Sequence, residues 1–183
     1  MLTPLRVLIL EDRPDDAELL AHELRRAGFD ADWRRAENEP EYLAHLEAPL
    51  DLILADYSLP EFDAIRALQL LRMREADIPL IVITGSISED AAVECIKLGA
   101  ADYLFKDRLA RLGSAVRQAL TQQELRSYKR MAEAALQESE ERFRAIFHST
   151  ALGIAIVDID GRLIMSNPAF QEMLGYTGEE LQH

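Results

Sequence analysis

Cysteine and basic charge are both scarce in this sequence, and each scarcity excludes a class of protein. Cys95 is the only cysteine, so a disulfide framework and a cysteine metal cluster are excluded, and a reducing cytoplasm is the expected compartment. The net charge of −13 argues against a binder of nucleic acid or of anionic membranes, because such proteins present basic patches. We therefore expect neither partner.

Long apolar runs are also missing. No segment approaches the roughly 18 consecutive apolar residues of a membrane span. The apolar run near the N-terminus ends at Glu11 and Asp12, which is too early for a signal peptide. A cytoplasmic protein is the expectation.

The apolar residues that are present form short runs of strand length. The runs at 6–10, 50–55 and 79–84 are rich in Val, Ile and Leu and are continuous rather than alternating. This pattern is typical of strands buried on both faces of a parallel sheet. Residues 29–34 and 101–105 are weaker candidates for two further strands.

Helical patterns alternate with these runs, and their ends carry capping signals. Asn38 with Glu41, and Ser86 with Glu89, form capping boxes, and Gly99 is a stop signal. The helical patterns are 14–27, 39–47, 63–74 and 87–98. Alternating strands and helices predict a doubly wound α/β fold around a five-stranded parallel sheet.

Glycine and proline are both missing between Gly113 and Gly153, so residues 114–147 are expected to form one long helix. Such a helix packs either on its own domain or on a second chain. We favour a homodimer through the 114–147 helix, because too little of the chain is left to cover a polar helix of this length. A weak heptad supports pairing; its members are Leu125, Tyr128, Ala132, Ala135, Ser139, Phe143 and Ile146.

The last segment of the sequence has a different pattern of residues. The stretch "GIAIVDIDGRLIMSN" predicts two strands joined by a tight turn. Asn167 before Pro168 predicts the start of a short helix that Gly175 ends, and Thr177 with Glu180 forms another capping box.

Three acids stand where predicted strands end: Glu11, Asp12 and Asp56. Each alone is explained as a strand-end acid that turns the chain or caps a helix. Together they would repel one another unless a cation lies among them, and Mg²⁺ is the hard ion that carboxylates prefer. Thr84 and Lys106 leave two further strands at the same edge. A hydroxyl and an ammonium beside a metal-bound carboxylate favour phosphoryl chemistry.

Four motifs in order carry a resemblance to a known family: "LILEDRPDD", "ILADYSLP", "IVITGS" and "GAADYLFKD". Over residues 5 to about 120 the chain resembles the receiver domain of bacterial two-component response regulators, which implies a flavodoxin-like fold. The resemblance implies that Asp56 accepts a phosphoryl group from a histidine kinase or phosphotransfer protein. It further implies that Asp12, Asp56 and the backbone carbonyl of Ser58 bind Mg²⁺ directly, with Glu11 helping through water.

The same resemblance assigns roles to three residues on the last strands. Thr84 would bind the phosphoryl group, and Lys106 would pair with it. Tyr103 matches an aromatic residue whose rotamer reports phosphorylation, so Thr84 and Tyr103 would form the switch. Ordinary half-buried packing is the competing interpretation of Tyr103.

Two positions depart from the family pattern. Ala64 stands where the family often has glycine, which leaves the shape of that loop open. Asp107 replaces the proline that usually follows the lysine in a cis peptide. A cis bond without proline costs roughly 3 kcal/mol, so we expect none here. Asp107 is also placed to compete for the charge of Lys106.

The tail, residues 138–183, resembles the start of a PAS sensor domain, and the strands that complete such a sheet are not in the sequence. The expected organisation is a receiver domain at 1–120, a coiled-coil-like linker at 121–142 and a partial PAS domain at 143–183. The implied function is a phospho-acceptor module that relays its state through the helix to a PAS-containing output. The alternative is a receiver that acts mainly in dimerisation or protein interaction, at the front of a larger PAS-containing cyclic-dinucleotide enzyme or hybrid histidine kinase.

Enzyme classes fit less well. Aspartyl phosphatases need a second aspartate two residues after the nucleophile, where this chain has Ser58, so slow self-dephosphorylation is the most we expect. A nucleotide or flavin binder needs a Gly-rich or hydroxyl-rich phosphate loop after the first strand, and the acids at 11–12 stand there instead. His148 lacks the sequence context of a kinase phosphohistidine.

Overall fold

A computed structural model describes residues 2–60, 62–85, 89–178 and 180–182 of the chain. The chain divides into two compact units, Met1–Arg126 and Ser127–His183.

The N-terminal unit is built on the predicted five-stranded parallel sheet, in the order β2-β1-β3-β4-β5. β1 pairs with β2 on one side and with β3 on the other. The strand order therefore reverses between β1 and β3: β2 lies on one side of β1, and β3, β4 and β5 lie on the other. The strands are β1 (Thr3–Leu10), β2 (Phe29–Ala36), β3 (Leu52–Asp56), β4 (Leu80–Thr84) and β5 (Asp102–Phe105).

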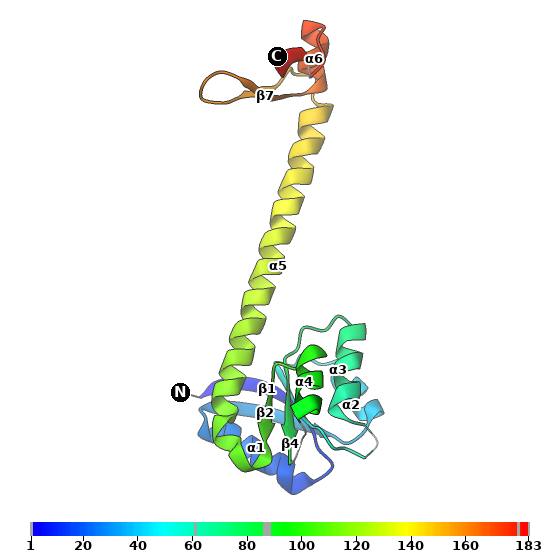
Figure 1. The fold of residues 1–183 in the computed structure, drawn as a ribbon, viewed down its shortest axis with the longest axis vertical. Coiled ribbons are helices and arrows are strands. Elements are labelled where there is room, and N and C mark those ends of the chain that lie inside the picture. The colour runs from blue at the N-terminus through cyan, green and yellow to red at the C-terminus, as the bar shows by residue number, and fades with distance from the viewer. Residues whose placement is uncertain (1, 61, 86–88, 179, 183) are drawn as a thin grey trace. The chain divides into compact units, whose positions relative to one another are not determined.

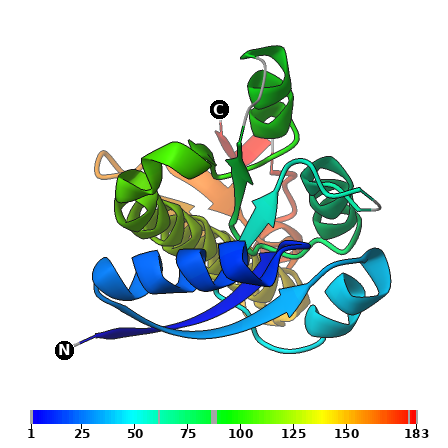
Figure 2. The same ribbon diagram turned by 90° about the horizontal axis from the view of Figure 1, so that it is seen from below.

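Helices cover both faces of this sheet (Figures 1 and 2). α1 (Pro14–Arg26) and the start of α5 (Leu112–Ser149) bury their apolar residues on one face, against side chains such as Val7 and Ile9. α2 (Glu39–His45), α3 (Ala64–Met73) and α4 (Glu89–Lys97) cover the other face. Because neighbouring residues of one strand point to opposite faces, both must be apolar, which explains the continuous runs.

Side chains cap the helices largely as the sequence predicts. Asn38 accepts a hydrogen bond from the Glu41 amide, and Glu41 accepts one from the amide of Glu37, one residue before the cap. Asp63 caps α3 by accepting from the Arg66 amide. The predicted box of Ser86 and Glu89 involves Ser86, which lies outside the described residues.

A 3₁₀ helix, η1 (Lys106–Arg111), follows β5 and leads into α5. Arg108 departs from helical geometry, with φ −129° and ψ 37°. The peptide bonds of the described residues are trans, including the one between Lys106 and Asp107, as predicted for a chain without proline there.

The long helix is longer than predicted: α5 runs from Leu112 to Ser149 instead of 114–147. Within the N-terminal unit its first turns are buried, at Leu112, Ala115, Val116 and Ala119. No helix among the described residues has an apolar stretch long enough to cross a bilayer.

The C-terminal unit contains the predicted hairpin and short helices. β6 (Ala155–Val157) and β7 (Leu163–Ser166) are antiparallel, and α6 (Pro168–Leu174) and η2 (Glu180–Gln182) follow. Asn167 is fully buried: its side chain accepts from the amides of Ile154 and Phe170 and donates to the carbonyl of Leu152. This cap ties the hairpin to α6. Among the unit's described residues, only Asn167 and Phe147 are buried.

A substitution at Gly113 tests how the start of α5 packs within the N-terminal unit. A Cβ atom at this position would lie 2.4 Å from the Cβ of Ala27 at the end of α1. Alanine in a helix is normally favoured over glycine by about 1 kcal/mol. Here we expect Gly113→Ala to lower the free energy of unfolding by about 1–3 kcal/mol, because the close contact forces the helices apart. Urea unfolding measures it.

The control is the double variant Ala27→Gly/Gly113→Ala, which moves the methyl group from one helix to the other. It should recover most of the stability lost in Gly113→Ala. A Gly113→Ala variant as stable as the wild type would contradict the packing of α5 on α1.

Candidate functional site

Three predicted acids lie together at the carboxyl edge of the sheet. The register that pairs Leu10 with Ala55 brings the ends of β1 and β3 side by side. One carboxylate oxygen from each of Glu11, Asp12 and Asp56 lies within 4.8 Å of the others. Glu11 and Asp56 are buried, whereas Asp12 is exposed. The acids thus lie at the carboxyl ends of β1 and β3, where the strand order reverses and where open α/β sheets generally bind ligands.

Lys106 supplies a cation to this cluster. Its Nζ atom lies 2.7 Å from an oxygen of each of three carboxylates, Glu11, Asp16 and Asp56. Asp107, which the sequence places next to it, is not among the described ion pairs of Lys106. The expected competition of Asp107 for this charge therefore finds no support in these contacts.

Asp16 is a site residue that the sequence patterns do not single out. It lies in the first turn of α1, where the helix dipole favours negative charge. The available signal was its spacing: α1 begins at Pro14, four residues after β1 ends. The first turn of α1 therefore lies beside the carboxyl end of β1, and Asp16 reaches the ammonium of Lys106.

Burial and charge shift the ionisation of this cluster. Burial raises the pKa of Glu11 to about 7, although hydrogen bonds from Lys106 and from the Arg13 amide act in the opposite direction. The hydrogen bond from Lys106 holds the pKa of Asp16 below its usual range. Burial alone would lower the pKa of Lys106, but its carboxylate partners outweigh burial and raise it.

The backbone after β3 holds Asp56 in place. The Tyr57 amide donates to the Ile83 carbonyl at 2.9 Å, which continues the pairing of β3 with β4. The Ser58 amide donates to Oδ1 of Asp56 at 3.0 Å, while Oδ2 contacts Lys106. The Ser58 residue itself is exposed. Both oxygens of the carboxylate are thus oriented by the protein.

The two other predicted residues lie on β4 and β5, which follow β3 in the order of the sheet. Thr84 is fully buried at the end of β4, one residue past Ile83, which pairs with Asp56. Tyr103 is half-buried on β5, packs with the α2–α4 side of the core and meets Phe105 edge to face at 6.0 Å. These contacts match ordinary strand packing, so the switch role of Tyr103 stays a prediction.

The donor set fits a hard divalent cation. All three clustered side chains offer carboxylate oxygens, the ligands that Mg²⁺ prefers. One of them, Glu11, is fully buried, and a buried carboxylate requires a cation or a proton. Lys106 supplies one positive charge to several acids, which leaves the cluster with an excess of negative charge.

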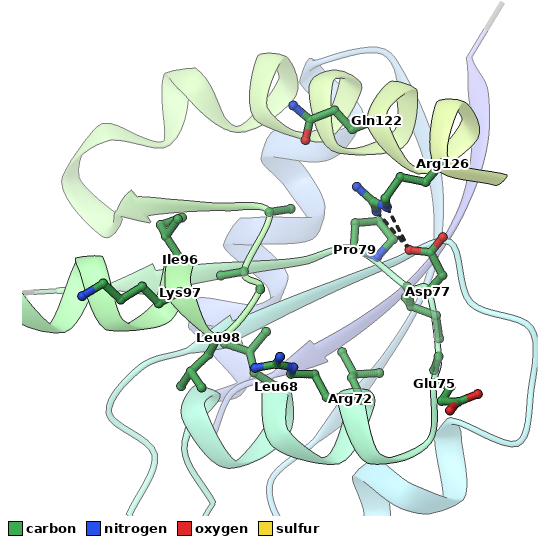
Figure 3. A pocket seen from close by; sticks show the side chains of 16 residues that line it. Leu68, Arg72, Glu75, Asp77, Pro79, Ile96, Lys97, Leu98, Gln122 and Arg126 are labelled. Carbon is green, nitrogen blue, oxygen red and sulfur yellow. Dashed lines mark hydrogen bonds and ion pairs between the residues drawn. The ribbon is translucent and has the colours of Figure 1, made fainter. Parts of the chain in front are cut away.

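A hollow lies at the opposite edge of the sheet (Figure 3). It has a volume of about 570 Å³ and is lined by the loop before β4, the loop before β5 and the side of α5. Its charged residues have both signs, and Arg126 on α5 donates to Asp77 at 3.0 Å. Gln123 donates to the Asp77 carbonyl at 2.7 Å. This hollow marks where α5 is attached, and it gathers no comparable set of reactive groups.

Comparison with known protein families gives two matches. A family model described as "Response regulator receiver domain" matches residues 7–117, and a model described as "PAS domain" matches residues 141–183.

The chain is similar to parts of three longer known proteins. The chain is 28% identical to the sensor histidine kinase TmoS of Ectopseudomonas mendocina over 96% of this chain and 21% of that protein. It is 30% identical to the regulatory protein AtoC of Escherichia coli, over 80% of this chain and 32% of that protein. It is 36% identical to the response regulator protein PilR of Pseudomonas aeruginosa, over 63% and 26%. The chain thus spans a third or less of the length of these relatives.

Solved structures agree on the fold. The signal receiver domain of a putative LuxO repressor protein from Vibrio parahaemolyticus superposes with a TM-score of 0.61 at 26% identity, over 68% of this chain and 96% of that one. The signal receiver domain of a signal transduction histidine kinase from Syntrophus aciditrophicus gives 0.54 at 30% identity, over 64% and 90%.

Because of the acidic cluster, we expect Mg²⁺ to stabilise the folded state of the chain. Because a ligand that binds only the folded state stabilises it, Mg²⁺ at about a hundred times its dissociation constant should add about 2.7 kcal/mol to the free energy of unfolding. Asp12→Asn should lose most of this gain. Urea unfolding with Mg²⁺ and with a chelator measures it.

Asp30→Asn is the matched control, because Asp30 is exposed at the start of β2, at the opposite edge of the sheet. It removes the same charge and should keep the full response to Mg²⁺. Equal responses from both variants would exclude the cluster as the binding site.

Proposed function

The chain belongs to the family of response regulator receiver domains, and on that premise we propose that Asp56 accepts a phosphoryl group. The observation that carries the proposal is the environment of the Asp56 carboxylate. One oxygen accepts from the Ser58 amide and the other contacts Lys106, beside Glu11 and Asp12. A nucleophile at the end of a buried strand is held rigidly, and its neighbours are suited to a phosphoryl group.

The transfer needs no change of oxidation state. An oxygen of Asp56 forms a bond to phosphorus while the bond from phosphorus to the donor breaks, and the electron pair of that bond leaves with the donor. In the cell the donor would be a phosphohistidine of a histidine kinase or phosphotransfer protein. Lys106 would donate to an oxygen of the transferred group, and Thr84 would bind another.

The proposed Mg²⁺ ligands are Asp12, Asp56 and the backbone carbonyl of Ser58, with Glu11 acting through water. When bound, the ion neutralises charge on the phosphoryl oxygens. The protein's own part is to hold these oxygen donors in a fixed arrangement. The convergence of the three carboxylates supports this assignment.

We assign the switch to Thr84 and Tyr103. A phosphoryl group adds negative charge and strong acceptors, to which a nearby hydroxyl can turn. Thr84 ends β4, and Tyr103 lies on the neighbouring β5. A shift at Thr84 would change the packing that is available to Tyr103.

The relay would run through α5. It would connect a receiver domain at 1–120, through a linker at 121–142, to a partial PAS domain at 143–183. Up to Arg126 the helix is attached to the receiver by buried apolar residues and by the bond of Gln123 to the Asp77 carbonyl. Arg126 also bonds to the side chain of Asp77 (Figure 3). Beyond this point, large apolar side chains on the helix are exposed, among them Tyr128 at 71% and Ile146 at 59%. Exposed apolar residues at three- and four-residue steps favour pairing with a second copy, as a homodimer.

The second candidate function is a receiver that works mainly as a dimerisation or interaction module. It would stand at the front of a larger PAS-containing cyclic-dinucleotide enzyme or hybrid histidine kinase. The observation that favours it is the match over 96% of the chain to a protein named a sensor histidine kinase. In both candidates Ser58 occupies the position where a phosphatase needs an acid, so this chain would at most dephosphorylate itself slowly.

Acetyl phosphate tests the acceptor role directly. With Mg²⁺, intact mass spectrometry should show the gain of one phosphoryl group in the wild type and none in Asp56→Ala. Asp30→Asn should be phosphorylated like the wild type. A wild type that gains nothing, or an Asp56→Ala variant that still gains one group, would remove Asp56 as the acceptor.

Sedimentation tests the relay and separates the two candidates. We expect the wild type to be a dimer and Tyr128→Glu to be a monomer. A charge among the exposed apolar residues of α5, here called the apolar stripe, opposes the burial of these residues between two copies. Ser127→Glu adds the same charge beside the stripe and should leave the dimer intact. A relay requires phosphorylation to change the dimer dissociation constant, whereas a simple interaction module does not. A wild type that is monomeric at high concentration, with and without acetyl phosphate, would exclude the relay through pairing.

A further inference from the structure

Lys106 faces three carboxylates in this structure. Its ammonium group has three N–H donors; it donates hydrogen bonds to Glu11 and Asp16, and Nζ also lies 2.7 Å from Asp56 in an ion pair. A phosphoryl oxygen that approaches Lys106 must therefore compete with these carboxylates for the ammonium group.

The three partners differ in what they lose when that happens. Glu11 is fully buried, so if it lost the ammonium, its negative charge would have neither a cation nor water beside it. Asp56 is itself the acceptor and changes its chemistry in the reaction. Asp16 comes from α1, and 23% of its side chain is exposed, so water can reach it when the ammonium leaves, unlike at Glu11. Asp16 is thus the partner that is free to compete with the incoming group.

Resting on the function proposed above, we propose that Asp16 is a positioning residue that restrains Lys106 and so slows phosphoryl acceptance at Asp56. It acts in two ways: its carboxylate occupies one N–H group of Lys106, and its negative charge opposes an anionic donor. During transfer from acetyl phosphate, Asp56 forms the new bond to phosphorus and acetate leaves with the electron pair of the broken bond. Asp16 touches neither reacting atom.

The test compares Asp16→Asn with Asp15→Asn in the full chain. Both substitutions remove one negative charge from the first turn of α1, but Asp15 is exposed and the structure places it in no described ion pair. With acetyl phosphate and Mg²⁺, phosphorylation of Asp16→Asn should be about three- to tenfold faster than that of the wild type. The gain should shrink as salt is added. Asp15→Asn should match the wild type.

A second measurement asks whether Asp16 acts through Lys106. In a double-mutant cycle with Lys106→Gln, followed by urea unfolding, the effect of Asp16→Asn on stability should disappear once Lys106 has been replaced. A purely local role of Asp16 in α1 would leave that effect unchanged and would overturn the proposal. Should Asp16→Asn fail to fold, Asp16→Ser provides the same comparison.

The outcomes separate the inference from the function on which it rests. A wild type that accepts no phosphoryl group overturns both. A wild type that is phosphorylated while Asp16→Asn reacts at the same rate or more slowly overturns the inference alone. An equal acceleration in Asp15→Asn also overturns it, because the effect would then come from net charge and not from the contact with Lys106.

Discussion

The contact of one ammonium group with three carboxylates is the interaction on which the candidate site depends. Glu11 is fully buried at the end of β1, and a charge in that position is costly unless a cation meets it. Lys106, the first residue after β5, reaches it and also contacts Asp56 on β3 and Asp16 on α1. A single side chain thus links the first, third and fifth strands to the first helix, and any event at Asp56 alters the charge balance of all of them.

The long helix α5 leads from the receiver to the rest of the chain, and its surroundings change along its length. Its first turns are buried against the sheet, and Gln123 and Arg126 hold it to the loop that carries Asp77. Farther along, large apolar side chains such as Tyr128 and Ile146 are exposed. A helix that is attached to the receiver at one end and exposes apolar side chains farther along is suited to carrying a change to a paired copy, and this is the physical basis for proposing a relay.

Sequence patterns anticipated most of the fold because the fold rests on local signals. Strands buried on both faces must be continuously apolar, so their runs are visible without any structure, and the caps at Asn38 and Asn167 use neighbouring amides. Prediction succeeded less well for contacts that depend on distant segments. The short spacing between β1 and α1 places Asp16 near the carboxyl end of β1, but its partner is a lysine 90 residues away in the sequence.

The sequence by itself therefore determined the order of strands and helices, the parallel sheet, the long helix and the identity of the acids at the strand ends. These features depend on residues within a few positions of one another, or on burial that every residue of a strand shares. Only the tertiary structure decided which carboxylates share Lys106, how deeply each is buried and where α5 is attached. Those outcomes depend on distances between side chains from separate elements, and such distances are set by packing the whole sheet and its helices together.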